Sequence, residues 1–581
     1  MKNFEIARIF NKMADMLELV GENRFRIQAY RRAALNLESL AEDVEEIARR
    51  DELEDIPGIG KDLASKIKDF LATGRIEAYE KIKKKTPAVL LEMVTIPGVG
   101  PKTAKRLFDA LKIKDIEDLE KKAKSHRISA LAGMKKKTEE KILKGIEFIK
   151  KKKGKMLLSV ALFTAETVIS RLEKLKDVAK ISYAGSLRRM KEMVRDIDIL
   201  AISTKPLKVM DVFTSIPEAK EVLAHGQTRS SILTKEDIQV DLRVMEKDLF
   251  GAAMVYFTGS KSHNIHLRKL AISKGLKVSE YGVFSARGGP ASGGKNKGNK
   301  RIASRTEEDV YRALGMAYVP PELREDSGEC EAALDDNLPD LVELEDIKGD
   351  FHVHSDWSDG SSSLEEMAMA AKARGYEYIV IADHSKSLKI ANGLSVKDRL
   401  EQIDRIHKLN KKLKGIEVLA GVEVDIMDDG SLDYSDDILK ELDVVTAAIH
   451  SGFTQSEEKL TRRTVTSMKN RYVHIIAHPT GRLLGEREGY QINIEEVLKA
   501  ARDTNTAIEV NSNPERLDLT DINCRRAKDL GVMIALTTDA HITYSLDHMR
   551  YGVSVARRGW LEKKNILNSL SWPAVRKRIK K

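Results

Sequence analysis

The chain from residue 351 to its C-terminus repeats one pattern, in which short apolar runs alternate with helical segments about every 30 residues. The runs have the length of buried strands and cover Tyr378–Ala382, Val418–Val422, Val444–Ile449, Ile475–Ala477, Ala507–Val510 and Met533–Leu536. Strands joined by helical crossovers lie parallel, because each crossover returns the chain to the same end of the sheet. The pattern therefore predicts a parallel sheet or a βα barrel.

Side chains that bind metals stand at the ends of these runs. His352 and His354 share one face of a first strand, since alternate residues point the same way. The other candidates each follow an apolar run or its neighbouring turn: Asp359, His384, Glu423, His450, His478, Asp539 and His541. Strand ends of a barrel converge on one mouth, and imidazole with carboxylate suits Zn²⁺ or Mn²⁺. One such histidine is more often structural, but six of the 13 histidines lie at strand ends, which favours a metal cluster.

A second constellation lies within residues 156–245, a helix followed by strand-like runs. Asp196 and Asp198 flank Ile197, so their carboxylates share one strand face, and Gly185-Ser186 precedes them. Asp241, between Val240 and Leu242, supplies a third carboxylate from a neighbouring strand. Three such groups can hold two Mg²⁺ ions for phosphoryl transfer. Solvent-facing edge-strand aspartates are the alternative, and the third aspartate favours the metal site.

The N-terminal quarter carries the whole excess of positive charge. Residues 1–155 hold 36 Lys and Arg against 26 Asp and Glu, and the remaining residues hold 64 of each kind. A local basic surface attracts a polyanion such as a nucleic-acid backbone. Solvated faces of amphipathic helices are the alternative reading of this charge.

Two Pro-Gly turns in this basic region each precede an amphipathic helix. Glycines bring backbone N–H groups close to a ligand, and a helix N-terminus favours a phosphate. The predicted phosphate contacts are Gly58, Gly60, Lys61 and Lys66 at the first turn and Gly98, Gly100, Lys102 and Lys105 at the second. The pair resembles the helix-hairpin-helix motif, which holds the DNA backbone without reading sequence. One copy would equally suit a plain helix connection, but two copies favour DNA binding.

The composition excludes several classes of protein. A length of 581 residues corresponds to about four domains. There is no apolar run of about 18 residues, so we expect no transmembrane helix, and Met1–Glu5 lacks the apolar stretch of a signal peptide. Cys330 and Cys524 are too few for a disulfide framework or a thiolate zinc site. We therefore expect a cytoplasmic protein.

Residues 1–325 resemble the family X DNA polymerases. The matching segments are Gly185-Ser186-Leu187-Arg188-Arg189, Asp196-Ile197-Asp198, Asp241 and Tyr256-Phe257-Thr258-Gly259-Ser260. The resemblance implies that the three aspartates hold two Mg²⁺ or Mn²⁺ ions and that Asp241 activates the primer 3′-hydroxyl. It also implies nucleotide contacts: Gly185, Ser186 and Arg189 at the triphosphate, Tyr256 and Phe257 beside the sugar, Gly259 in the same segment beside the incoming nucleotide, and Asn264 at the minor-groove edge of the base.

Lys66 aligns with the family lysine that forms a Schiff base with a 5′-deoxyribose phosphate. Tyr30 and Arg26 fall at phosphate-contact positions of the same site. Asp62 and Phe25, however, replace a basic residue and a histidine of the vertebrate members. Phosphate binding is therefore the expected role of Lys66, with lyase chemistry and a plain helix-surface lysine as alternatives.

Residues 349–581 resemble the polymerase-and-histidinol-phosphatase (PHP) superfamily, and all nine of its metal-ligand positions are filled. The resemblance implies a distorted (βα)₇ barrel, up to three Mn²⁺ or Zn²⁺ ions, and hydrolysis of phosphodiesters or phosphomonoesters. Asn511, Asn513 and Arg482 are further candidates for substrate contacts, with structural roles as the alternative.

We therefore expect a multidomain chain of all-α helix-hairpin-helix domains, an α/β nucleotidyltransferase palm with a thumb, and a PHP barrel. The expected boundaries are a lyase-type domain at 1–88, a fingers-like domain at 89–155, the palm at 156–245, the thumb at 246–324, an acidic linker at 325–348 and the PHP domain at 349–581. A glycine-rich loop at 285–300 interrupts the thumb.

The expected function is a DNA-directed DNA polymerase that fills short gaps in base excision repair and carries a PHP 3′–5′ exonuclease. Abasic-site endonuclease and 3′-phosphatase activities are further expectations, with gapped or nicked DNA and deoxynucleoside triphosphates as partners and a monomer by default. A template-independent nucleotidyltransferase joined to a small-molecule phosphoesterase is one alternative, which the tandem hairpins disfavour. A DNA-end scaffold with vestigial sites is another, which the complete ligand sets disfavour.

Overall fold

The structure is a computed structural model that describes residues 2–38, 44–56, 58–94, 96, 99–131, 134–152, 154–285 and 300–579. Its contacts divide the chain into two compact units, which consist mainly of residues 1–153 and mainly of residues 154–581. Residues 286–299, most of the expected glycine-rich loop, lie outside the described residues. No helix in the described parts has the length and apolar content needed to cross a lipid bilayer.

The first unit is helical, as the amphipathic pattern predicts. Its helices are α1 (Lys2–Leu19), α2 (Arg24–Glu38), α3 (Val44–Arg49), α4 (Lys61–Thr73), α5 (Glu77–Lys85), α6 (Ala88–Met93), α7 (Pro101–Leu111), α8 (Ile116–Lys124) and α9 (Lys136–Lys152). They pack around two separate aliphatic clusters. One cluster includes Phe10 and Ile67, and the other includes Leu107 and Ile142. Each cluster contains one of the two hairpin helices, α4 and α7.

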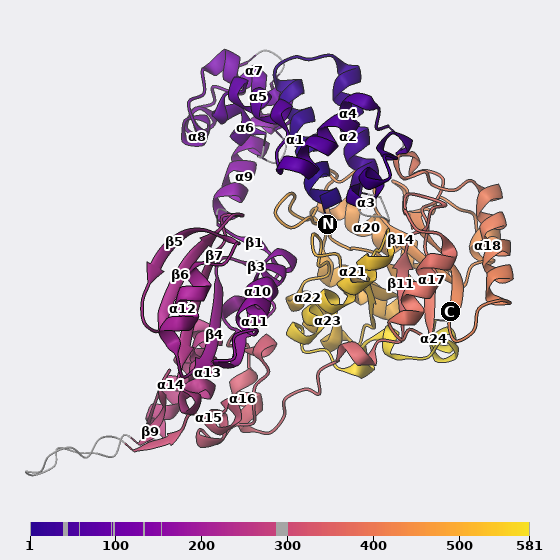
Figure 1. The fold of residues 1–581 in the computed structure, drawn as a ribbon. Coiled ribbons are helices and arrows are strands. Elements are labelled where there is room, and N and C mark those ends of the chain that lie inside the picture. The colour runs from indigo at the N-terminus through magenta and orange to yellow at the C-terminus, as the bar shows by residue number, and fades with distance from the viewer. Residues whose placement is uncertain are drawn as a thin grey trace, which may run out of the picture. The chain divides into compact units, whose positions relative to one another are not determined.

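The second unit begins with a five-stranded sheet in the order β2-β4-β7-β6-β5. Figure 1 labels its strands β4, β5, β6 and β7. Its strands are β2 (Val178–Tyr183), β4 (Ile197–Ser203), β5 (Ala219–His225), β6 (Arg229–Thr234) and β7 (Gln239–Met245). Helices α10 (Leu158–Leu172) and α12 (Pro206–Thr214) pack against β4 residues Ile197 and Ile199, while α13 (Phe250–Thr258) packs against Leu200. The short helix α11 (Gly185–Arg188) and the β1–β3 pair (Met156–Leu157 and Met193–Val194) lie before β4.

The next part combines helices with a small sheet and continues into the acidic segment. Its elements are α14 (Lys261–Ser273), β8 (Leu276–Ser279), β9 (Gly282–Ser285), β10 (Arg301–Ala303), α15 (Glu307–Ala313) and α16 (Glu329–Leu334). The acidic segment is therefore partly helical. It is held by buried groups, since His263 on α14 hydrogen-bonds Glu329 at 2.7 Å and Tyr311 at 2.9 Å.

The C-terminal part is a nearly closed barrel of seven parallel strands in sequential order. The strands are β11 (Gly349–Val353), β12 (Tyr378–Ile381), β13 (Glu417–Asp425), β14 (Val444–Ala448), β15 (Ile475–Ile476), β16 (Ala507–Asn511) and β17 (Ile534–Thr537). The helices are α17 (Leu364–Ala373), α18 (Val396–Asn410), α19 (Asp436–Leu439), α20 (Glu457–Met468), α21 (Ile494–Thr504), α22 (Asp521–Leu530), α23 (Met549–Arg558) and α24 (Trp572–Ile579). Trp572 and Val575 of α24 pack against alternate strand residues such as Phe351 and Val444.

The predicted fold class is confirmed. Each apolar run named from the sequence coincides with a strand of the barrel, with ends that differ by a residue or a few. The agreement has a simple cause: strands buried on both faces are continuous apolar runs, which the sequence displays directly.

Candidate metal centres

The palm aspartates gather at one end of two parallel strands. Asp198 on β4 is the register partner of Asp241 on β7, and Asp196 immediately precedes β4. Ile197 and Ile199 point to the opposite face and are buried, as the alternation of a strand requires. The structure therefore brings together the two carboxylates predicted from separate strands.

The charges of these aspartates oppose one another. The pKa of Asp198 is raised to about 6, first because burial disfavours the carboxylate and then because Asp196 and Asp241 repel its charge. Ser231 donates a hydrogen bond to Asp241 and holds it in place. A divalent cation would relieve this repulsion, since oxygen ligands of this kind suit Mg²⁺. The donor set thus fits the predicted ions.

Gly185 allows the chain to turn directly against Asp198. Its φ is +63°, and a Cβ at this position would lie 2.7 Å from the Asp198 Oδ2. Any side chain would therefore suffer both backbone strain and a clash with a carboxylate that is a candidate metal ligand. Ser186 follows as the second residue of α11.

Arg189, the predicted triphosphate contact, is engaged by other protein groups. Its Nε lies 3.0 Å from Glu325, and its guanidinium also donates to the backbone oxygen of Thr258. Arg558 of α23 lies 3.2 Å from the same Glu325 and donates to the Arg189 backbone oxygen at 2.8 Å. A triphosphate at Arg189 would have to compete with Glu325.

The predicted sugar and base contacts lie together at the junction of α13 and α14. Tyr256 and Phe257 meet edge to face at 5.1 Å, with the Arg243 guanidinium 4.5 Å from the Phe257 ring centre. Asn264 donates to the Tyr256 backbone oxygen at 2.7 Å. Gly259 has φ +70°, and a Cβ there would lie 3.2 Å from Arg189.

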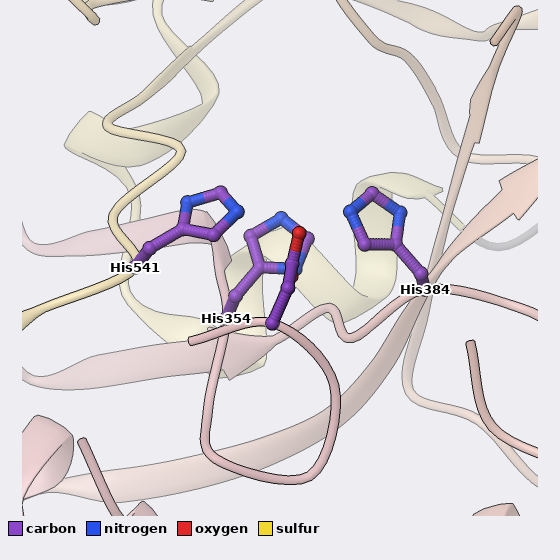
Figure 2. A group of neighbouring side chains, drawn as sticks. His354, His384 and His541 are labelled. Carbon is purple, nitrogen blue, oxygen red and sulfur yellow. The ribbon is translucent and has the colours of Figure 1, made fainter. Parts of the chain in front are cut away.

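All nine predicted barrel ligands lie in one cluster. Within the part of the chain that the structure describes, their ligand atoms form three overlapping groups: His354, Asp359, His384 and His541; His352, His354 and Asp539; and His384, Glu423 and His450. His478 joins through its Nε2, which is 2.8 Å from Glu423. Figure 2 shows the rings of His354, His384 and His541 side by side, with centroids 4.5 Å and 4.2 Å apart for the two pairs that include His354.

The donor atoms of this cluster converge in a way that suits cations. The Nε2 atoms of His352 and His354 are 3.1 Å apart, and the Glu423 carboxylate lies 3.0 Å from His384 and 3.2 Å from His450. Imidazole nitrogens held this close either share a proton or share a metal ion. Nitrogen and carboxylate donors together fit Mn²⁺ or Zn²⁺.

The electrostatics of the cluster favour bound positive charge. Burial alone would lower the pKa of His450, but Glu423 and Asp425 raise it to about 9. Burial would also lower the pKa of His352, but the nearby charges of Glu423 and Glu509 raise it well above its ordinary value. A site whose carboxylates hold protons on buried histidines would also hold metal cations in their place.

Three carboxylates around the ligands were missed by the sequence reasoning. Glu509 on β16 lies 2.8 Å from the His352 Nδ1, and Asp425 lies 2.5 Å from the His450 Nδ1. Asp383 accepts from the Ser355 backbone at 2.8 Å. Glu509 and Asp425 are thus placed to orient ligating imidazoles. The sequence feature that could have identified Glu509 is a charged residue within an otherwise apolar run.

The further substrate candidates also have protein partners. Asn511 donates to the Asp539 carboxylate at 3.0 Å, and the Asn513 side chain accepts from the Glu515 backbone at 3.0 Å. Arg482 lies 2.7 Å from Glu192. Asn511 is thus the one in direct contact with a candidate ligand.

The hairpin turns are present in the helical unit. Gly58 has φ +78°, and Gly60 and Gly100 precede the first residues of α4 and α7. Lys61, Lys102 and Lys105 are exposed on these helices. Gly98 lies outside the described residues.

Lys66 differs from the exposed lysines of the hairpins. It is 8% exposed, and its Nζ lies 2.5 Å from Asp62, the residue that departs from the family pattern. Tyr30 is buried, and Arg26 lies 2.9 Å from Glu22. The ammonium group of Lys66 is therefore held in an ion pair inside the helical unit.

Comparisons with known families match four segments of the chain. They are a helix-hairpin-helix domain at residues 1–76, a SAM-like helix-hairpin-helix tandem at 90–147, the DNA polymerase beta thumb at 253–325 and a PHP domain at 350–513. The DNA polymerase/3′-5′ exonuclease PolX of Bacillus subtilis (strain 168) is 38% identical over 569 residues, which are 98% of this chain and 97% of that protein. The chain belongs to the PolX family of DNA polymerases. As a member of this family, the chain binds DNA and uses divalent metal ions as cofactors.

Other relatives of this PolX chain match only about a third of it. A protein named as a probable phosphatase from Thermoanaerobacter sp. (strain X514) is 31% identical over 231 residues, 38% of this chain and 89% of that protein. Another so named, from Caldanaerobacter subterraneus subsp. tengcongensis, is 33% identical over 208 residues, 34% of this chain and 77% of that protein.

Proposed function

We propose that this PolX chain fills short gaps in DNA during base excision repair and shortens 3′ ends with its barrel. The proposal is carried by one observation: two separate clusters of candidate metal ligands occur in one chain, the palm aspartates and the nine barrel residues. The substrates are gapped or nicked DNA and deoxynucleoside triphosphates, and the protein acts as a monomer on DNA in the cytoplasm.

In the palm, Asp196, Asp198 and Asp241 would hold two Mg²⁺ or Mn²⁺ ions, which would supply charge stabilisation for phosphoryl transfer. Asp241 accepts the proton of the primer 3′-hydroxyl. A hydrogen bond from Ser231, on the neighbouring strand β6, fixes the position of that carboxylate. Gly185, Ser186 and Arg189 hold the triphosphate, and Arg189 leaves Glu325 to do so.

The nucleotide is positioned by the residues at the start of α14. Tyr256, Phe257 and Gly259 line the sugar, and Asn264 faces the base. The contact from Asn264 to the Tyr256 backbone supports this arrangement, because it fixes the Asn264 side chain against the end of α13. These groups orient the substrate and do not take part in proton transfer.

In the barrel, the nine ligands would hold up to three Mn²⁺ or Zn²⁺ ions, which would supply Lewis-acid chemistry for phosphoester hydrolysis. Glu509 and Asp425 orient His352 and His450 through their second ring nitrogens. The phosphatase names of the shorter relatives favour a second activity at this site, removal of a 3′-phosphate. Abasic-site cleavage is a related reaction of the same chemistry.

The helical unit grips the DNA backbone through its two hairpins. The exposed positions of Lys61, Lys102 and Lys105 support phosphate contact there. For Lys66 we propose a phosphate-binding or structural role, since its ammonium group is paired with Asp62. Schiff-base chemistry at Lys66 would require that pair to open.

The test uses a 5′-labelled primer on a one-nucleotide-gapped duplex with Mn²⁺, with and without deoxynucleotides. Extension by one nucleotide and shortening, respectively, are expected. His354→Ala should abolish shortening and leave extension intact. Shortening that survives His354→Ala would contradict the barrel assignment, and a wild type that shortens but never extends would contradict the assignment of the palm.

A further inference from the structure

The loop after His384 presents an isoleucine to solvent at the mouth of the barrel. Ile390 is 92% exposed, the highest value among the described large apolar residues, whereas Ala391 and Leu394 of the same loop are buried. Isolated exposed apolar residues are ordinary on protein surfaces. Ile390 differs from these because its loop is attached next to His384, a candidate metal ligand.

The base of the loop is closed by hydrogen bonds. Leu394 donates its backbone N–H to the His384 oxygen at 2.9 Å, and Tyr434 donates to the Leu394 oxygen at 2.5 Å. Gly393 lies so close that a Cβ would be 1.9 Å from the Ser385 oxygen. The loop therefore leaves and rejoins the fold next to a candidate metal ligand.

The two sides of the loop are tied to segments that carry other candidate ligands. Asn392 donates to the backbone oxygen of Ser358, the residue before Asp359, at 3.3 Å. On the other side, Ser387 donates to Asp425, the carboxylate that holds His450. The loop is thus fixed at the rim of the metal cluster.

The charge of the loop suits a nucleic-acid backbone. Lys386 and Lys389 are exposed on it, close in sequence to Ile390. Lysines contact phosphates without reading sequence, and apolar side chains such as isoleucine insert between base steps. A duplex end is therefore the occupant that matches both features.

The burial of the metal ligands affects how the end of a duplex can reach them. His352 and His354 are fully buried, and Glu423 is 2% exposed. Asp359, His450 and His541 are half-buried and form the accessible edge of the cluster. A terminal nucleotide reaches the deeper ligands past this edge more easily when it is no longer paired and stacked. Enzymes that act on single nucleotides in duplexes must first remove them from the stack.

We propose that Ile390 is a strand-separating residue, which wedges against the terminal base pair of a duplex 3′ end while Lys386 and Lys389 hold the backbone. The ligand is thus a base-paired DNA 3′ end. The inference rests on the proposed exonuclease function. It adds that the exonuclease acts on base-paired 3′ ends by separating their strands.

The test compares Ile390→Ser with the wild type on a single-stranded oligonucleotide and on the same 3′ strand fully paired, both with Mn²⁺. Digestion of the paired end should fall about tenfold, since one stacked base-pair step contributes about that factor. Digestion of the single strand should be unchanged. Ile390→Leu should retain paired-end digestion, and Ile522→Ser, at a 78% exposed isoleucine on α22, should behave as wild type.

The outcomes separate this inference from the proposed function. Equal digestion of the paired end by wild type and Ile390→Ser would overturn the role of Ile390 as a wedge. Digestion of the single strand in the same experiment would still support the exonuclease function. An equal loss on both substrates would also overturn it, because a wedge acts on paired ends alone. A wild type that digests neither substrate would overturn the exonuclease and the wedge together.

Discussion

Asp198 and Asp241 are register partners on the neighbouring parallel strands β4 and β7, with their side chains on the same sheet face. Asp196 adds a third carboxylate from the residue before β4. This relationship concentrates negative charge at one strand end, and the predictions for the palm follow from it.

Asp241→Ala should reduce primer extension by about 10²–10⁴-fold, the usual contribution of a positioned general base. Because the barrel ligands are a separate cluster, exonuclease activity on the same primer should persist. Single-nucleotide extension and primer shortening measured on one preparation check this. Parallel loss of both activities would contradict two independent centres.

Asp198→Asn should stabilise the metal-free protein at pH 8. The pKa of Asp198 is raised from 3.8 to about 6 by burial and by its two aspartate neighbours. The folded state therefore favours the protonated form, and that stabilisation is lost as the pH rises through 6. Asparagine carries no charge and avoids this loss. The variant should therefore gain up to about 3 kcal/mol in free energy of unfolding at pH 8.

Urea unfolding in chelator at pH 8 and pH 5 measures this difference. The gain should shrink at pH 5, and saturating Mg²⁺ should remove it because the ion compensates the carboxylates. A variant that is equally stabilised at both pH values would show that the charge of Asp198 is not the cause.

Gly185→Ala should lower extension by at least about tenfold, because a left-handed backbone disfavours a Cβ by about 1–2 kcal/mol and the new Cβ meets Asp198. Gly275→Ala is the matched control, since Gly275 has φ +66° and open space around it. Steady-state extension rates of the two variants give the comparison. Equal effects would mean that backbone strain alone matters.

Glu423→Gln should reduce the metal content of the barrel, because Glu423 faces His384, His450 and His478. Elemental analysis of the dialysed protein measures the ions bound per chain. Glu417→Gln, on the exposed start of the same strand β13, should keep the wild-type content. Unchanged metal in Glu423→Gln would remove this residue from the ligand set.

Glu325→Gln should lower the KM for deoxynucleotides by about two- to fivefold, the range expected for a partly exposed ion pair. Burial alone would raise the pKa of Glu325, but Arg189, Lys191 and Arg558 hold it below its ordinary value, so the carboxylate competes with a triphosphate. Glu322→Gln, which breaks an ion pair with Arg557, is the control. An unchanged KM would mean that Arg189 does not bind the triphosphate.

Much of this architecture could be read without coordinates. The barrel strands and the nine ligand candidates were visible because a buried parallel strand is an apolar run and its end carries the functional side chain. Asp196 and Asp198 were paired by alternation alone. Local periodicity suffices for such features, since each depends on residues close together in the chain.

The sequence by itself therefore determined which elements form and which residues stand at their ends. Only the tertiary structure decided that Asp198 faces Asp241, that Glu509 orients His352, that Glu325 holds Arg189, and that Ile390 projects from a loop tied to Ser358 and Asp425. The physical reason is that register, ion pairing and exposure depend on which distant segments become neighbours. No local pattern records that choice.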